Sequence, residues 1–305
     1  TKQFTGMEIA PTAIRMAIVE KSGKTWRLVK GASIPLPEGT IKPSFKSPNI
    51  VEPKLFLEAV QRLLTEFEGT ARTVGLSLPS EIVRILIRGY PKLPDSRAEI
   101  EKLISWSLEK SFHFPIENTK VSYQVTGSDV SGMTHLLVTI AMKDVIRQYE
   151  DLLAQLNVDT RVVRPAGVNL YNFFSPNLPR QGTHAFLGLF DNYFSFLVFE
   201  NARLTFFHGV NRGFSDLQFF QDVDLTMQHY LESSPGKRFE RLSFGSQVGY
   251  HAELKEVLSN LIDIKLDILG EGELIESEFD LSQPLERLKL SSFASALGAA
   301  QSLAK

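Results

Sequence analysis

The segment HAFLGLFDNYFSFLVFENARLTFFH, residues 184–208, carries the strongest structural pattern in this 305-residue chain. It contains three short apolar runs, at residues 184–190, 193–199 and 203–208, and turn-forming residues separate them. This spacing predicts three consecutive β-strands joined by tight turns. The middle run is apolar on both faces, so we expect it within a sheet that is covered on both sides.

The residues that follow alternate between helix and strand. A helix is predicted over residues 214–232, because apolar side chains recur there at the helical period. A short strand at 241–244, a second helix and a strand at 264–269 complete the unit. The apolar positions that define the two helices are Leu217, Val223, Met227 and Tyr230 in the first, and Leu254, Val257, Leu258 and Leu261 in the second.

The same order of elements occurs in the first half of the chain. Phe4–Glu20 is extended and mostly apolar, a turn at residues 22–24 follows, and Trp26–Ile34 returns as a strand. Residues 35–53 hold five prolines and predict a connecting loop. A helix follows, and then a strand at Thr73–Leu78. Two copies of one order of elements predict a duplicated α/β domain.

An extra α/β segment lies between the two copies. Ser96 and Glu99 have the spacing of a capping box at the start of a helix. Residues 120–125 and 135–142 predict strands, and residues 144–156 predict an amphipathic helix. This segment reads as an inserted subdomain.

These elements divide the chain into five parts. We expect residues 1–90 to form the first half of domain I, residues 91–160 an inserted α/β subdomain, residues 161–182 a connecting segment, residues 183–290 domain II, and residues 291–305 a C-terminal helix that packs back near the domain interface.

The composition is that of a folded protein without a strong charge bias. Thirty-three Lys and Arg residues and 35 Asp and Glu residues give a formal net charge of −2, which argues against a nucleic-acid partner. The chain has no Cys, so disulfides and Cys-ligated zinc are excluded. The six His residues are scattered without metal-binding spacing, so no metal site is expected. No apolar run approaches the roughly 18 residues that span a bilayer, so we expect a cytoplasmic protein without direct membrane insertion.

The pattern resembles a known architecture. A duplicated α/β domain with a cleft between its copies is similar to the actin-like fold of sugar kinases and Hsp70-type ATPases. Gly6-Met7-Glu8-Ile9-Ala10 is similar to the first phosphate loop of that fold. Residues 31–39, the strand before Leu78-Pro79, residues 106–116 and the Ala-rich residues 294–300 resemble segments of PilM-type proteins of type IV pilus assembly. The cytoplasmic domain of GspL and the division protein FtsA share this architecture.

The resemblance implies a nucleotide site, and the first phosphate loop departs from it. Glu8 stands where the fold usually has Asp, and its longer side chain would shift the geometry around a metal ion. Ala10 and Pro11 replace a Gly and a residue that donates a backbone N–H. Thr12 and Arg15 are the polar residues that remain in this loop.

The second half departs from the nucleotide site as well. Gly188 stands where relatives carry an acid, and Phe190 where their backbone approaches phosphate. Asp191 is displaced from the expected acid and is also a typical turn residue. Gly245, followed by Ser246, is what remains of a glycine run beside the adenine, and the connecting strand 162–166 lacks the acids that relatives often carry there.

These departures predict no cofactor, although ATP with Mg²⁺ stays open as an alternative. The segment from 186 to 220 holds ten Phe residues. They predict either a sheet buried on both faces or an exposed protein-binding patch. We further hypothesise that Phe190 and Phe244 occupy nucleotide space and lock the two halves in one state of closure.

For PilM-type proteins, the resemblance implies that a short peptide of a membrane protein binds in a groove between domain I and the inserted subdomain. The candidate groove residues, for which core packing is the alternative role, are Leu78, Trp106, Phe114, Pro115 and Ile116.

The sequence therefore predicts a cytoplasmic actin-like adaptor of type IV pilus or related secretion assembly. It would be recruited to the inner face of the inner membrane by the cytoplasmic tail of a PilN-like protein, and it could contact components of the pilus motor. The alternative is a nucleotide-switched ATPase of the same fold. A small-molecule kinase ranks third, because no catalytic carboxylate stands out near the predicted phosphate loops.

Overall fold

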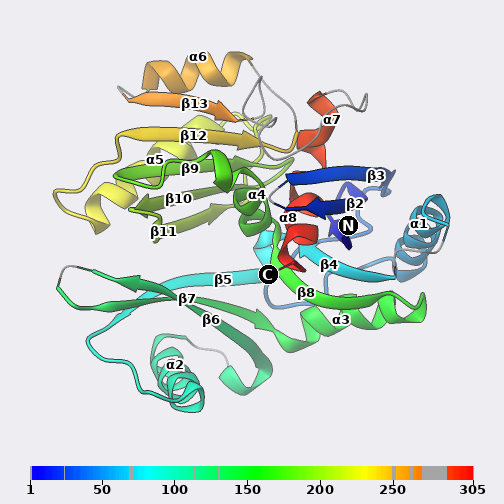
Figure 1. Ribbon diagram of the computed structural model, residues 1–305, viewed down its shortest axis with the longest axis horizontal. Helices are drawn as coiled ribbons and strands as arrows, with labels where there is room; N and C mark the ends of the chain where they lie inside the picture. Colours follow the sequence, from blue (N-terminus) through cyan, green and yellow to red (C-terminus); the bar gives the residue numbers. More distant parts are fainter. Residues whose placement is uncertain are drawn as a thin grey trace.

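The computed structural model describes residues 2–23, 25–68, 72–112, 115–129, 131–248, 252–261, 264–269 and 287–304. It shows two five-stranded sheets and one three-stranded sheet (Figure 1). The two larger sheets lie side by side, and the smaller sheet lies below the second of them in this view. The predicted actin-like α/β architecture is confirmed.

The first sheet has the strand order β3-β2-β1-β4-β8. The first three strands pair antiparallel, and β4 and β8 then add in parallel. Two helices cover one face, because their apolar stripes pack on the alternate buried residues of the strands. The bounds are β1 Lys2–Ile9, β2 Ala13–Ser22, β3 Thr25–Pro35, β4 Thr73–Leu78, β8 Asp159–Pro165, α1 Pro53–Glu66 and α3 Lys143–Gln155.

The second sheet repeats this topology strand for strand, with the order β11-β10-β9-β12-β13. Again three strands pair antiparallel and two add in parallel, so the predicted duplication is confirmed. The bounds are β9 Thr183–Leu189, β10 Phe194–Glu200, β11 Arg203–Val210, α5 Phe219–Ser233, β12 Arg241–Ser246, α6 Ala252–Leu261 and β13 Lys265–Leu269.

The Phe-rich segment is core. Tyr193–Phe199 is buried along its whole length, with alternate residues packed into the core under α5 and into a second core between the lobes. None of the ten Phe residues between 186 and 220 is exposed. The buried-sheet interpretation is therefore confirmed, and the alternative of an exposed Phe patch is wrong.

Two expected elements have different bounds. Phe4–Glu20 is not one extended segment but two strands, because the chain reverses at residues 10–12 between β1 and β2. The helix expected from residue 214 begins at Phe219, and Leu217 lies before it with its side chain fully exposed. Leu217 matched the helical period by chance.

The inserted sheet has the order β5-β7-β6, and α2 packs on one of its faces. The bounds are β5 Val83–Tyr90, α2 Arg97–Ser111, β6 Thr119–Ser128 and β7 Thr134–Met142, with short 3₁₀ turns η1 Ser80–Ile82 and η2 Ile116–Asn118. The capping box is confirmed: Glu99 N donates to Ser96 Oγ, and Ser96 Oγ donates to the Glu99 carboxylate.

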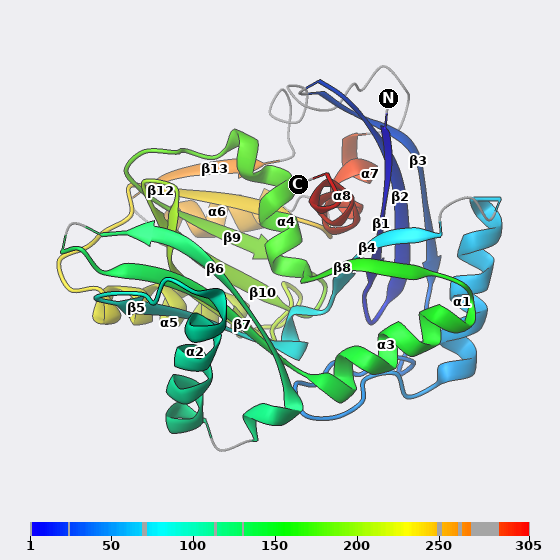
Figure 2. The ribbon, with the colours of Figure 1, turned by 60° about the horizontal axis from the view of Figure 1, so that its bottom comes forward.

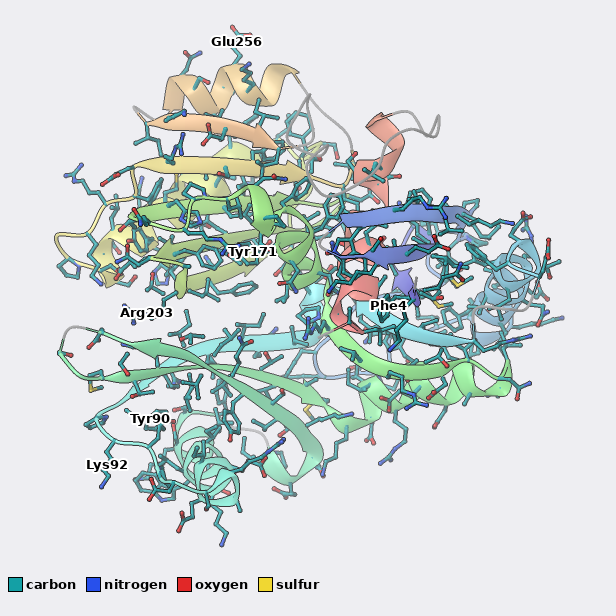
Figure 3. All side chains as sticks on the ribbon, viewed as in Figure 1. Phe4, Tyr90, Lys92, Tyr171, Arg203 and Glu256 are labelled. Carbon is teal, nitrogen blue, oxygen red and sulfur yellow. The ribbon has the colours of Figure 1, made fainter. Side chains whose placement is uncertain are left out.

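The inserted sheet starts before the boundary expected at residue 91, since β5 pairs with β7. The inserted sheet also ends before residue 160, the other expected boundary, because α3 packs into the core of the first sheet and β8 pairs with β4. On the far side, the sheet faces the second lobe. Arg203, at the start of β11, lies at the edge of the second sheet toward the inserted sheet (Figure 3).

Three further helices lie between the lobes or beside them. They are α4 Ala166–Phe174, followed by the 3₁₀ turn η3 Ser175–Asn177, then α7 Arg287–Ser292 and α8 Ala294–Ser302. All nine residues of α8 are buried. Figure 2 shows α8 wedged between α4 and the strands of the first sheet.

Glycines allow this central helix to approach the sheet. A Cβ on Gly6 of β1 would lie 1.8 Å from the carbonyl oxygen of Ala296, and one on Gly75 of β4 would lie 2.2 Å from that of Ala299. On the opposite side of the helix, a Cβ on Gly298 would lie 2.1 Å from the carbonyl oxygen of Asn169 in α4. The close packing of α8 therefore requires glycine in both of its contact surfaces.

Candidate functional site

The central cleft lies where the first hairpin turn of each lobe faces the other. Residues 10–12 form the turn between β1 and β2, and residues 190–192 form the equivalent turn between β9 and β10. Thr12 Oγ1 donates a hydrogen bond of 2.7 Å to Asp191 Oδ2. The two turns that would flank a phosphate in a nucleotide-binding relative thus contact each other directly.

Glu8 is the centre of a buried polar network in this cleft. Its side chain is 1% exposed, and it lies opposite Arg15 in the antiparallel pairing of β1 and β2. Arg15 Nη1 donates to Glu8 Oε2 at 3.2 Å, and Gln247 Nε2 donates to the same oxygen at 2.6 Å. Ser295 Oγ in turn donates to Gln247 Oε1 at 2.6 Å. The network joins the first lobe, the second lobe and α8.

The charge of Glu8 is compensated only in part. Burial raises the pKa of the Glu8 carboxyl, while the positive charge of Arg15 and the hydrogen bond from Gln247 act in the opposite direction. The Glu8 carboxyl group therefore links the two lobes and α8 through hydrogen bonds.

The space directly beside Glu8 is small. A cavity of about 30 Å³ remains there, and Phe190, Tyr193, Pro79 and Glu81 contribute to its walls. That volume is comparable to one water molecule, whereas ligand pockets measure about 300 to 1,000 Å³. The small cavity alone therefore does not fit Mg-ATP, but a larger cavity of about 890 Å³ adjoins it at Ser80, Glu81 and Tyr193, between β5 and β11.

The hypothesis that Phe190 and Phe244 fill the cleft does not hold for Phe244. Phe244 is 2% exposed and packs in the core of the second lobe, under α5. Phe190 lines the small cavity, and its role in closing the cleft stays a prediction.

Four of the predicted nucleotide residues lie together at this cleft. Glu8, Arg15 and Asp191 line the cavity, and Thr12 is bonded to Asp191.

The other three lie within the second sheet. Gly188 and Gly245 are partners in the parallel pairing of β9 and β12. A Cβ on Gly188 would lie 2.8 Å from Ser195 Oγ, and one on Gly245 would lie 2.8 Å from the Phe174 ring. Ser246 is buried, and its hydroxyl accepts from the backbone N–H of Val248. These glycines make room for side chains of the protein.

Sequence reasoning missed three polar residues of the cleft. Gln247 directly follows the end of β12 at Ser246, so a polar residue just after a strand was the available signal. Ser295 lies in an Ala-rich helix and gave no signal. Glu81 lines the cavity, and burial raises its pKa to about 7.

A second concave site lies between the first lobe and the inserted sheet. It is a groove of about 310 Å³, larger than the cleft cavity. Its floor is apolar and its rim carries hydroxyl and charged groups. The lining residues are Leu78, Ile82, Val83, Lys120, Ser122, Thr139, Ala141, Ile146, Glu150, Thr160, Arg161, Val163, Arg164 and Pro165. We call this site the outer groove.

Two strand edges border the outer groove. Among the described strands, β8 pairs with β4 alone and β6 pairs with β7 alone. The outer edge of each therefore presents backbone N–H and C=O groups without a strand partner. Figure 2 shows β8 running beside α3, where β7 leads into that helix.

The predicted partner-binding residues are spread over different places. Leu78 lines the outer groove, although it is only 1% exposed. Ile116 is buried in the core under α2, and Trp106 is 56% exposed on α2, with Lys110 Nζ 3.5 Å from its ring centroid. Pro115 is exposed, and Phe114 lies outside the described residues.

The position of α2 explains this spread. It packs on Leu136, Val138 and Ile140, whereas the groove is lined by Thr139 and Ala141 on the opposite face of the same sheet. No described side chain of α2 lines the groove.

Solved structures share this fold. The chain is similar to a structure of the PilM-PilN type IV pilus biogenesis complex, with a TM-score of 0.79 and 17% identity over 99% of this chain and 98% of that one. It is also similar to the cytoplasmic domain of EpsL, an inner membrane component of the type II secretion system of Vibrio cholerae, with a TM-score of 0.51 and 12% identity over 95% and 94% of the two chains. A Bacteroides thetaiotaomicron protein with an actin-like ATPase fold has a TM-score of 0.51 and 9% identity, covering 88% and 90%.

At these identities the similarity establishes the fold. The fold of PilM-type proteins, expected from the sequence, is confirmed. No protein-family model matches the sequence. No curated protein matches it either.

Two further observations concern membranes and metals. None of the described helices is long and apolar enough to cross a membrane. Within the same part of the chain, no group of three or more His, Asp or Glu side chains is placed to hold a metal ion.

Proposed function

We propose that this protein is an actin-fold adaptor of a type IV pilus or related secretion assembly, and that the outer groove holds the cytoplasmic tail of a PilN-like inner-membrane protein. The observation that carries the proposal is an open groove that is bordered by free strand edges. An extended tail can bind such an edge through backbone hydrogen bonds, while its side chains enter pockets.

The likeness to the PilM-PilN complex supports this assignment, because that complex pairs a chain of the same fold with a second pilus protein. Binding a membrane protein's tail would hold the adaptor at the inner face of the inner membrane. Contact with components of the pilus motor would then couple the membrane protein to that motor.

Steric blocking of the groove tests the proposal. Ser122 is exposed on β6 and lines the groove, so Ser122→Trp fills the groove without disturbing a core. Gln124→Trp is the matched control, because Gln124 is exposed on the same face of β6 and does not line the groove. The measurement is fluorescence anisotropy of labelled peptides that span the cytoplasmic tail of a PilN-type protein.

We expect Ser122→Trp to weaken binding by at least about tenfold, or 1.4 kcal/mol, and Gln124→Trp to bind like the wild type. Equal binding by both variants would remove the groove as the site. No binding by the wild-type protein would refute the proposed function.

The proposal also states that the central cleft does not bind a nucleotide. The rival function, a nucleotide-driven switch, requires Glu8 to exchange its bonds to Arg15 and Gln247 for a metal-bound nucleotide. Calorimetric titration with Mg-ATP and with ADP separates the two. We expect no heat of binding at millimolar nucleotide, and micromolar affinity would favour the switch.

A further inference from the structure

The outer groove has a charged residue whose charge is not balanced. Four charged side chains line the groove. Lys120 Nζ lies 3.8 Å from Glu150 Oε1, and Arg161 is paired with Asp159. Arg164, on β8, has no hydrogen-bond or ion-pair partner among the described residues. The groove therefore has an excess of positive charge, and that excess is concentrated at Arg164.

Arg164 is also partly withdrawn from water. Its side chain is half-buried, and this burial lowers the pKa of the guanidinium. The group stays charged all the same, because arginine does not lose its proton in proteins. A desolvated charge without a partner is unfavourable, and buried charges are normally paired. An anion beside Arg164 would remove this cost.

The strand that carries Arg164 also restricts the form of such an anion. β8 is the last strand of the first sheet, and Arg164 lies opposite Ser77 in its pairing with β4. An extended segment added to the free edge of β8 would pass Arg164 at a fixed register, since side chains repeat every second residue along a strand. A guanidinium presents several donors in a planar fork, and a carboxylate matches that geometry with two parallel hydrogen bonds.

The remaining lining complements apolar side chains. Ile82, Val83, Ala141, Ile146 and Val163 contribute carbon surface to the groove. The chemistry of the groove is thus a free backbone edge, an apolar floor and one unpaired cation.

We propose that the bound tail carries an aspartate or glutamate that pairs with Arg164, within an otherwise apolar extended segment. This inference rests on the proposed function and adds the chemical identity of one tail residue. It makes Arg164 the residue that determines specificity, while the strand edge supplies backbone hydrogen bonds that any sequence can make.

A positional-scanning array of immobilised nine-residue peptides tests the inference, because it presents every residue type at every position of the bound segment. The fluorescently labelled wild-type protein, Arg164→Gln, Arg164→Lys and Arg147→Gln are applied to the same array. Arg147→Gln is the matched control, because it removes the same charge from a residue that does not line the groove and that is already paired, with Asp144. Circular dichroism shows that each variant is folded.

We expect the wild type to favour Asp or Glu at one position by about tenfold to a hundredfold, the range for a hydrogen bond to a charged group. Arg164→Gln should lose that preference and keep the apolar preferences. Arg164→Lys should keep part of the acidic preference, and Arg147→Gln should keep it all.

Two results would overturn the inference. If the wild type binds apolar peptides without preferring Asp or Glu, or if Arg147→Gln loses the preference as fully as Arg164→Gln, the pairing with Arg164 is wrong and the proposed function stands. If the wild type binds no peptide, both fail. If Arg164→Gln does not fold, the preference of the wild-type protein for Asp or Glu on the array tests the inference by itself.

Discussion

The central cleft and the outer groove both form where separate sheets of the chain come together, yet their chemistry is opposite. In the cleft, the polar groups bond to one another: Thr12 to Asp191, and Arg15 and Gln247 to Glu8. In the outer groove, two strand edges have no strand partner among the described residues, and Arg164 has no anion. The cavity volumes differ about tenfold, at roughly 30 and 310 Å³.

Under the proposed function, this duplicated fold works outside the cleft between its two copies. A cleft that contains a nucleotide must keep donors and metal ligands free for it. Here a carboxylate of the protein, Glu8, takes the donors of Arg15 and Gln247, and a continuous apolar core with α4 and α8 joins the lobes behind it. Under the proposed function, binding takes place at the edge of the first lobe, where the inserted sheet supplies the second wall.

The largest effect is expected from Gly6→Ala, which disrupts the close contact between β1 and α8 behind the cleft. The new Cβ would lie 1.8 Å from the carbonyl oxygen of Ala296, and a backbone atom in a packed helix cannot give way. We expect the free energy of unfolding, measured in urea, to fall by at least about 3 kcal/mol.

Gly31→Ala is the control, because the nearest atom to its Cβ is a Phe293 ring carbon at 3.4 Å, an ordinary contact. If both variants lose the same stability, the close approach of α8 is not what holds the lobes together.

The next effect concerns Glu8. Glu8→Ala removes the anion and leaves Arg15 and Gln247 without their acceptor in a buried place, which should cost about 2 to 3 kcal/mol of unfolding free energy. Glu8→Gln keeps the shape and should cost less. Adding formate to Glu8→Ala should restore part of the stability, because the small anion fits the vacated volume. A Glu8→Ala protein as stable as the wild type would show that the network does not hold the two lobes together.

The smallest effect is a pH dependence at the edge of the cleft. Burial raises the pKa of Glu81 to about 7 in the folded protein, from 4.5. The folded state therefore binds the proton more tightly than the unfolded state does. The burial of Glu81 does not lower the free energy of unfolding below about pH 4.5, and it lowers that free energy increasingly between about pH 4.5 and 7. Because Glu81 is partly exposed to solvent, we expect Glu81→Gln to be more stable than the wild type by about 1 to 2 kcal/mol at pH 8, which is less than the full shift would give.

At pH 4.5 the two proteins should be equally stable. Thermal unfolding at both pH values checks this, and a stability difference that does not change with pH would contradict it.

The fold was predictable because the two copies share a pattern that repeats along the chain. The alternation of strands and helices and the capping box at Ser96 are local signals, and the structure confirms them. The errors were local as well. The turn at residues 10–12 was missed inside a long apolar stretch, and Leu217 matched a helical period outside the helix.

The site was predictable only in part. Residues near the two hairpin turns were found because a resemblance marks those turns. Gln247 and Ser295 were not found, because they meet Glu8 only after distant segments pack together. Trp106 and Ile116 were candidates for the partner site by their apolar character, but sequence does not show which face of a sheet a helix covers. Arg164 could be recognised only once its surroundings were known.

The buried position of α8 has a consequence for the order in which the protein is made. Synthesis proceeds from the N-terminus at about 5 to 20 residues per second, so β1 and β4 leave the ribosome well before residues 294–302. Until then, the face of the first sheet that carries Gly6 and Gly75 has no cover, and the two lobes lack the helix that joins them. That surface therefore stays uncovered in the nascent chain until α8 has been synthesised.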